Sequence, residues 1–144
     1  MQITLSYIIN YIIAFSVGIY LIVYLFKIPY LLGNDPKLIN EYYIHKHHTF
    51  VPIDAILVAK YLLFSFIFIK ILNTNLFTYK LLIIIATTIL TTSIFCFYFT
   101  NKKLDKNNIY SRWFHSVGYY SAIYDAILLS IIYIVFNHMN QLVL

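Results

Sequence analysis

The stretch Gly118-Tyr-Tyr-Ser-Ala-Ile-Tyr-Asp-Ala-Ile-Leu-Leu-Ser130 decides the fold, because it sets one carboxylate inside an otherwise uncharged apolar run. Small residues recur in it at every fourth position, which places them on one stripe of a helix where a second backbone can approach closely. A shorter version, Ile53-Asp-Ala-Ile-Leu-Val58, opens an earlier apolar run. We therefore predict two related helices, each with an aspartate beside a stripe of small residues: Asp125 with Gly118, Ala122, Ala126 and Ser130, and Asp54 with Ala55 and Ala59.

The composition is that of a membrane protein. Of the 144 residues, 62% are hydrophobic and only 10% are charged, which is far from the average soluble domain. Ten basic and five acidic side chains cannot cover the surface of a soluble domain of this length, whereas a bilayer requires no such cover. The single cysteine, Cys96, can form no intrachain disulfide, so a disulfide framework and a paired-thiol redox site are both excluded.

Four apolar runs have the length needed to cross a hydrocarbon core of ~30 Å. They cover residues 3–26, 51–72, 76–99 and 117–136. The segment Asn73-Thr-Asn75 between the second and third runs is too short for anything but a tight reversal. We predict an all-α, polytopic membrane protein: a single domain over residues 1–144 that forms a four-transmembrane-helix bundle made of two helical hairpins.

The first connection, residues 27–50, contains a helix-start signal. Asn34-Asp-Pro36 offers a side-chain cap followed by proline in the first turn. Downstream of it the apolar and polar side chains separate onto two faces, which is typical of a helix lying in the headgroup region. We predict a short interfacial helix whose apolar side is formed by Leu38, Ile39, Tyr42 and Tyr43.

The basic residues predict the topology. The connections 27–50 and 101–116 hold seven Lys and Arg, against Lys70 and Lys80 at the opposite end. Both connections should therefore be cytoplasmic and both termini non-cytoplasmic. These basic residues record topology and contact with anionic lipid headgroups, not nucleic acid. Aromatic residues near the same end, among them Trp113 and Phe114, are interpreted as a belt at the membrane interface.

The first span carries its own stripe of small and polar residues at four-residue spacing. Such a stripe favours close helix contact, and an amide within it can hydrogen-bond to a neighbouring helix. The predicted contact residues are Ser6, Asn10, Ala14 and Gly18.

Lys60 and Asp125 lie at similar distances from the cytoplasmic ends of their spans, about 13 Å and about 12 Å along a helix axis. An isolated charge near the bilayer centre costs at least ~2.5–3.5 kcal/mol, so each should seek the other. The pair can fix helix register, or it can belong to a proton or ion path. Such a path would use Asp54, Lys60, Asp125, His115, Tyr61, Tyr120 and Tyr124.

Asp54 lies nearer to the cytoplasmic end than Asp125 and needs other partners. The predicted partners are Arg112, His115 or a loop histidine, with Tyr124 as a further polar neighbour.

Glu41, His45 and His48 occur at i, i+4 and i+7 of the predicted interfacial helix. Imidazole and carboxylate groups at this spacing suit zinc or iron. The alternative is a basic patch that binds anionic headgroups. No nucleophile–His–Asp order, phosphate-binding glycine loop or H-E-x-x-H motif is present, and no cofactor is expected.

Two short motifs carry a resemblance. Val51-Pro-Ile-Asp54 at the start of one span, and Trp113-Phe, Gly118 and Ala122-Ile-Tyr-Asp125 around another, resemble small four-span membrane proteins of large nucleocytoplasmic DNA viruses. The resemblance implies an organellar or virion membrane and no particular reaction.

These features favour a structural or interaction role in a cellular or viral membrane over an enzyme. The expected partners are the lipid bilayer and either further copies of the chain or other membrane proteins. The first alternative is a proton or ion conductor that uses the Asp/Lys pair, and the second is a lipid- or metal-handling membrane enzyme that uses the cytoplasmic histidines.

Overall fold

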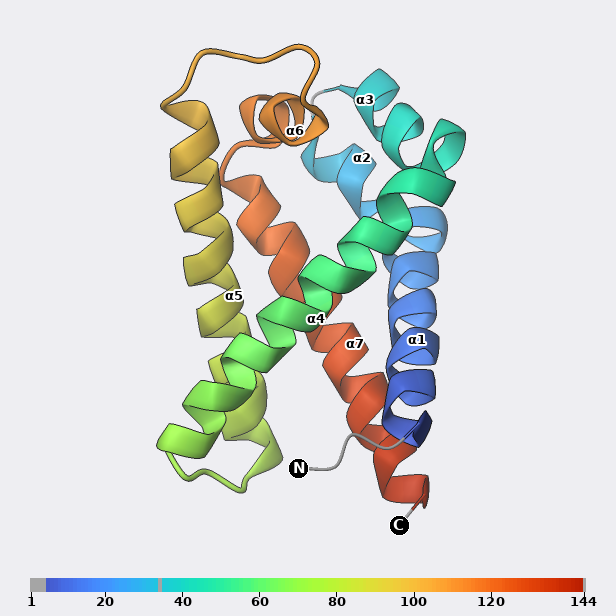
Figure 1. Ribbon diagram of the computed structural model, residues 1–144, viewed down its shortest axis with the longest axis vertical. Helices are drawn as coiled ribbons and strands as arrows, with labels where there is room; N and C mark the ends of the chain where they lie inside the picture. The colour runs from blue at the N-terminus through green and yellow to red at the C-terminus, as the bar shows by residue number, and fades with distance from the viewer. Residues whose placement is uncertain (1–4, 34, 144) are drawn as a thin grey trace.

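The computed structural model describes residues 5–33 and 35–143, and this part of the chain is helical with no strand (Figure 1). Nine helical segments follow one another in these described residues. In chain order they are α1 (Leu5–Ile19), the π-helical η1 (Tyr20–Leu25), α2 (Ile28–Leu32), α3 (Pro36–Asn40), the π-helical η2 (Glu41–His45), α4 (His47–Ile71), α5 (Phe77–Thr100), α6 (Ile109–Val117) and α7 (Tyr120–Val143).

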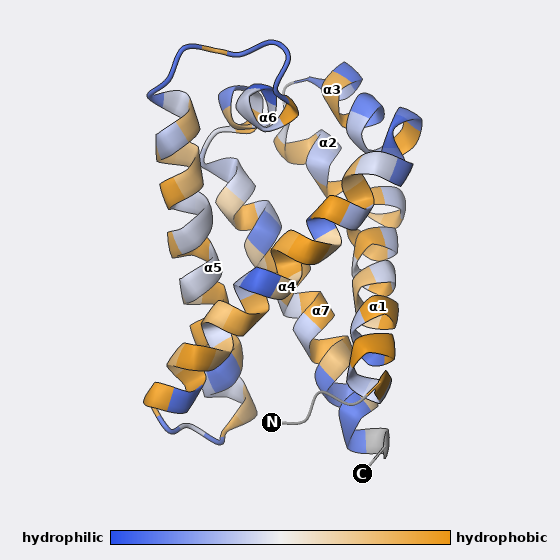
Figure 2. Cartoon of the chain, in the orientation of Figure 1, coloured by the Kyte–Doolittle hydropathy of each residue, from blue (hydrophilic) through white to orange (hydrophobic). Residues whose placement is uncertain are grey.

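Four helical stretches of the described residues, the first made of α1 and η1 together, are long and apolar enough to cross a membrane, which confirms the predicted spans at this level. They are Leu5–Leu25, His47–Ile71, Phe77–Thr100 and Tyr120–Gln141. Figure 2 shows the same division, with hydrophobic residues along the long helices and hydrophilic ones in the connections. The second helix begins earlier than predicted, and the last one begins later and runs further.

Helix α7 is the central element of the bundle, since it packs against both α1 and α5. Helix α4 packs on α5 and crosses α7 at an inclined angle (Figure 1). Ile84 of α5 and Ile132 of α7 are fully buried in the resulting core. Helices α4 and α5 are consecutive and joined by a tight turn in which Asn73 has a left-handed φ of 47°. The division of the bundle into two hairpins stays a prediction.

The stripe of α1 that was predicted to make contacts faces α7. Ala14 is fully buried, and a Cβ placed on Gly18 would lie 2.6 Å from Ile132 Cγ1. Asn10 Nδ2 donates a hydrogen bond of 2.8 Å to Asn140 Oδ1. Small residues therefore bring α1 and α7 close together, and a polar pair joins the first part of α1 to the last part of α7.

The first connection is more structured than predicted, with three helical segments instead of one. Asp35 caps α3 by accepting hydrogen bonds from the backbone N–H groups of Lys37 and Leu38 at 3.1 and 3.2 Å. The predicted apolar side is buried inside the protein. It consists of Leu38, Ile39, Tyr42 and Tyr43. The placement of this segment relative to a membrane interface stays a prediction.

Helix α6 was missed, since residues 101–116 were predicted as a basic connection. Asn108 begins this helix by accepting hydrogen bonds from the N–H groups of Tyr110 and Ser111 at 2.9 and 3.1 Å. Its amphipathic face buries Trp113 and Phe114 against the bundle. The interpretation of these two rings as part of an interfacial belt is therefore wrong.

Gly118 separates α6 from α7. Its φ of 60° and ψ of −142° are open to glycine but strained for other residues, and nothing lies within 4 Å of a Cβ built on it. The sequence analysis placed Gly118 in a helix-contact stripe, and this prediction is wrong. Gly118 instead makes the turn between the two helices. The fourth span consequently starts at Tyr120 and not at residue 117.

Candidate functional site

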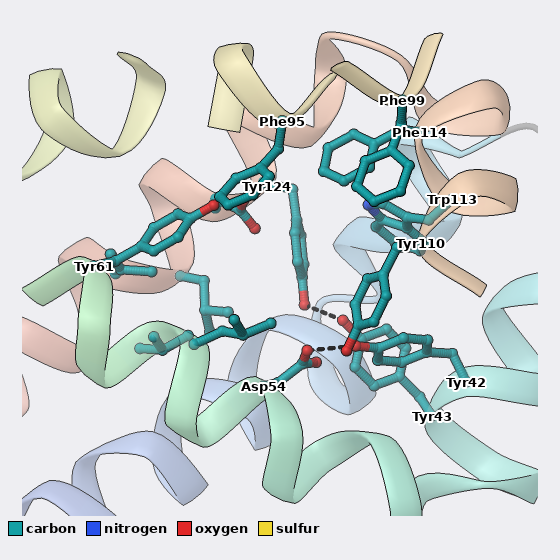
Figure 3. Close-up of a pocket in the computed structure, with 15 residues that line it drawn as sticks. Tyr42, Tyr43, Asp54, Tyr61, Phe95, Phe99, Tyr110, Trp113, Phe114 and Tyr124 are labelled. Atoms are coloured by element: carbon teal, nitrogen blue, oxygen red, sulfur yellow. Dashed lines mark hydrogen bonds between the residues drawn. The ribbon is translucent and has the colours of Figure 1, made fainter. Parts of the chain in front are cut away.

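A cavity of about 230 Å³ lies between α4, α5 and α7, beneath α6 and η2 (Figure 3). Five segments that are distant in the sequence contribute to its wall. The lining residues are Tyr42 and Tyr43 of η2; Asp54, Leu57, Val58 and Tyr61 of α4; Phe95 and Phe99 of α5; Tyr110, Trp113 and Phe114 of α6; and Tyr124, Asp125, Leu128 and Leu129 of α7.

Aromatic rings make up most of this wall and contact one another. The ring centroids of Trp113 and Tyr124 are 5.9 Å apart, and those of Trp113 and Tyr42 are 6.1 Å apart. On the other side, Phe99 and Phe114 stack with centroids 5.3 Å apart. These ring contacts join α6 to α5 and α7, and η2 to α6, and they give the cavity an apolar surface.

Asp54 enters the cavity from α4, and its Oδ1 accepts a hydrogen bond from the Tyr42 hydroxyl (Figure 3). Asp54 pairs with none of the predicted partners. Arg112 instead binds Glu41. His115 is exposed, and its ring nitrogens lie 2.8 Å from Ser111 O and 3.2 Å from Lys102 O.

Asp125 enters the cavity from α7, and its Oδ2 accepts a hydrogen bond of 2.6 Å from Thr92 Oγ1 of α5. Lys60 is exposed and takes part in none of the ion pairs of the described residues. The predicted Lys60–Asp125 pair is therefore not formed. The cavity face of α4 follows the helical stripe 54, 57, 58 and 61, and Lys60 falls outside it because each residue turns by about 100°.

A buried pair of hydroxyls joins η2 to α7 at the cavity wall. The hydroxyl oxygens of Tyr43 and Tyr124 are 2.7 Å apart (Figure 3). Burial, the largest cause, raises the pKa of the Tyr43 hydroxyl well above its ordinary value of 10. Tyr43 therefore stays neutral, and either hydroxyl can donate this hydrogen bond. Of the other predicted polar neighbours, Tyr61 lines the cavity while Tyr120 is exposed.

The charged residues that line the cavity are all acidic. Two of the five acidic residues of the chain line it, namely Asp54 and Asp125, and none of the ten basic residues does. Among residues 5–33 and 35–143, the ion pairs are those of Glu41 with Lys46 and with Arg112. Within the described part of the chain, the two cavity carboxyl groups thus have hydroxyl donors but no cationic partner.

Glu41, His45 and His48 do not come together as a metal site. Both Glu41 carboxylate oxygens bind Arg112, at 2.8 and 3.0 Å, and one also binds Lys46 at 2.7 Å. Segment η2 ends at His45, and His48 belongs to the first turn of α4, so the predicted i, i+4, i+7 alignment is broken. In the described part of the chain, no three His, Cys, Asp or Glu side chains are arranged to hold a metal ion.

The remaining predicted contact residues lie on α4 and α7. Ala122 and Ala126 are buried, and Ser130 Oγ donates a hydrogen bond of 2.6 Å to Ala126 O. Ala55 and Ala59 are half-buried, and the Tyr11 hydroxyl of α1 donates a hydrogen bond to Ala55 O.

The aromatic part of the site was missed. Its signal was present in the sequence, because Tyr42, Tyr43 and Trp113 are large apolar rings within connections that otherwise carry charges. Rings in such a context can form a buried cap as readily as an interfacial belt.

Comparison of the chain with protein-family models, with curated proteins and with solved structures finds no match for it.

Proposed function

We propose that this chain is a multi-pass integral membrane protein of a cellular or viral membrane with an interaction role, and that it binds a small molecule in the cavity between α4, α5 and α7. The single observation that carries the proposal is the cavity itself, which is apolar, aromatic and furnished with two carboxyl groups. A largely apolar pocket with a few convergent polar groups is the usual form of a small-molecule site.

The way in which the cavity is capped supports this role. The rings of η2 and α6 close over the long helices, and Arg112 of α6 is tied to Glu41 of η2 by two hydrogen bonds. Contacts within the protein therefore hold the cap in place, so little ordering is required when a ligand binds. A preformed site of this kind suits binding and retention.

The single tryptophan of the chain provides a direct test, since Trp113 lines the cavity. We expect saturable changes in Trp113 fluorescence when the protein in lipid nanodiscs is titrated with a panel of small compounds: toluene, dimethylbutanol, choline and benzoate. The variant Leu57→Phe adds volume at a lining residue and should weaken any binding. Leu63→Phe makes the same change on an exposed face of α4 and should not. If no compound gives a saturable change, the proposed function is wrong.

We also propose that the connections on the cavity side face the cytoplasm and that both termini lie on the opposite side. The proposal rests on the seven basic residues in residues 27–50 and 101–116. In oriented vesicles, Asp105→Cys should react with a membrane-impermeant maleimide only from the cytoplasmic side, and Asn75→Cys only from the other. The native Cys96 is buried and should give little background. Reversed labelling of the two variants would contradict this orientation.

A further inference from the structure

We infer that the ligand of the cavity is a small organic ammonium ion with apolar substituents, such as a tertiary or quaternary amine. This inference rests on the proposed binding function and specifies the chemical class of the ligand. Three observations lead to it: the sign of the charges in the wall, the aromatic rings around them, and the volume.

The distribution of charge selects for a cation. The chain as a whole is basic, with ten Lys and Arg against five Asp and Glu. The cavity wall reverses this balance, because it contains Asp54 and Asp125 and no Lys, Arg or His. An anionic ligand would meet two carboxyl groups and no positive partner, so the cavity selects against anions.

Each carboxyl group accepts a hydrogen bond from one hydroxyl group of the protein. Asp54 Oδ1 accepts from Tyr42, and Asp125 Oδ2 accepts from Thr92. In the described part of the chain no ion pair reaches either group. A carboxylate within a membrane bundle is costly without a partner of opposite charge. A bound cation would supply that partner to one or both groups.

The rings supply the second part of an ammonium site. Tyr42, Trp113 and Tyr124 form a contiguous cluster in the wall, and Tyr61 stacks on Phe95 on another side, with centroids 6.4 Å apart. The negative faces of such rings attract alkylated ammonium groups, and cages of this kind recognise quaternary amines. The rings also present apolar area to the alkyl substituents.

A metal ion fits this wall less well. Hard cations such as Ca²⁺ require six or more oxygen ligands, and Mg²⁺ requires a near-octahedral set. The cavity offers two carboxyl groups and a few hydroxyls among rings and leucines.

The volume of the cavity is about 230 Å³, which equals roughly eight water molecules at ~30 Å³ each. This volume is sufficient for a branched ammonium ion.

The test compares choline with the dimethylbutanol isomer 3,3-dimethylbutan-1-ol, in which a carbon atom replaces the ammonium nitrogen of choline. Binding is followed by Trp113 fluorescence of the full chain in lipid nanodiscs at constant ionic strength. We expect choline to bind about tenfold more tightly than its neutral analogue, or more, because a desolvated cation gains from both the rings and the carboxylates. NaCl and KCl at the same concentration should not compete.

Two variants identify the charges responsible. Asp54→Asn and Asp125→Asn each keep an acceptor for the Tyr42 or Thr92 hydroxyl, so the fold should be preserved. At least one should weaken choline binding by about tenfold more than it weakens dimethylbutanol binding. Asp35→Asn is the matched control, because it removes the same charge at the α3 cap, where asparagine caps equally well. It should leave both affinities unchanged.

The outcomes separate the two proposals. If the neutral compounds bind saturably but choline binds no more tightly, or if both aspartate variants keep full choline affinity, the ammonium inference is overturned and the binding function stands. If neither the charged nor the neutral compounds bind to folded protein, both are overturned. Binding of the neutral analogue by each variant shows that its cavity is intact, and thermal unfolding shows that its fold is.

Discussion

Arg112 and Glu41 form a two-point ion pair that joins segments 71 residues apart in the chain, with Nη1–Oε2 at 2.8 Å and Nη2–Oε1 at 3.0 Å. The side chains are 29% and 25% exposed, so solvent screens the pair only partly. This ion pair connects the two segments that cover the cavity, since Arg112 lies on α6 and Glu41 on η2. Parallel hydrogen bonds between planar groups of opposite charge are strong and geometrically selective.

We expect Arg112→Lys and Glu41→Gln each to lower the free energy of unfolding in detergent, because neither side chain can reproduce the two-point geometry. In a double-mutant cycle the coupling between the two positions should be about 1 kcal/mol. Losses that simply add would show that the pair contributes nothing to stability.

The same carboxylate should make stability depend on pH in the acid range. Hydrogen bonds from Arg112, followed by those from Lys46, lower the pKa of Glu41 from 4.5 to about 2. Because the folded-state pKa is the lower one, this stabilisation is complete above the unfolded-state pKa and is lost as the pH falls from about 4.5 towards 2. Glu41→Gln should flatten the stability profile in that window, whereas Asp105→Asn, a change in an exposed loop, should not. An unchanged slope in Glu41→Gln would assign the acid sensitivity to other groups.

The hydrogen bond between Thr92 and Asp125 should be a buried polar link between α5 and α7. We expect Thr92→Val to destabilise by ~1–3 kcal/mol, because the Asp125 oxygen then loses its hydroxyl donor between the two helices. Thr91→Val is the control, since Thr91 Oγ1 bonds the backbone of its own helix at Thr87 O. Equal effects in the two variants, measured by unfolding in the same detergent, would contradict this assignment.

The contact between α1 and α7 leaves no room for a side chain at position 18. We expect Gly18→Ala to cost ~1–3 kcal/mol, because its Cβ would overlap Ile132 Cγ1. The loss should be smaller in an Ile132→Ala background, where that atom is absent. Ile12→Val, on an exposed face of α1, should be close to neutral. A full loss in the Ile132→Ala background would place the clash elsewhere.

The sequence predicted the parts of the fold that depend on local chemistry. Hydropathy identified the four long helices, and the Asp35-Pro36 signal identified the start of α3. The Asn108 cap of α6 is a signal of the same kind. It was overlooked because the neighbouring lysines were interpreted only as topology markers.

The pairing of polar residues could not be predicted in this way. Depth along a helix is set by residue number, but rotation about the helix axis is set by tertiary packing. For this reason the prediction placed Lys60 opposite Asp125, whereas the inclined α4 presents Asp54 and Tyr61 to the cavity and leaves Lys60 exposed. The structure of the first connection could not be predicted either. The π-helical η2 ends at His45, which interrupts the helical periodicity on which the metal hypothesis depended.

The turn at Gly118 has a consequence for the genetics of this chain. Every single-nucleotide missense change of a glycine codon introduces a residue with a side chain, and each would be strained at the backbone angles of Gly118. Because the space beside it is open, the size of the new residue should matter little. In a saturation library, alanine and tryptophan at position 118 should therefore be depleted to similar extents, whereas at Gly18 depletion should increase with side-chain volume.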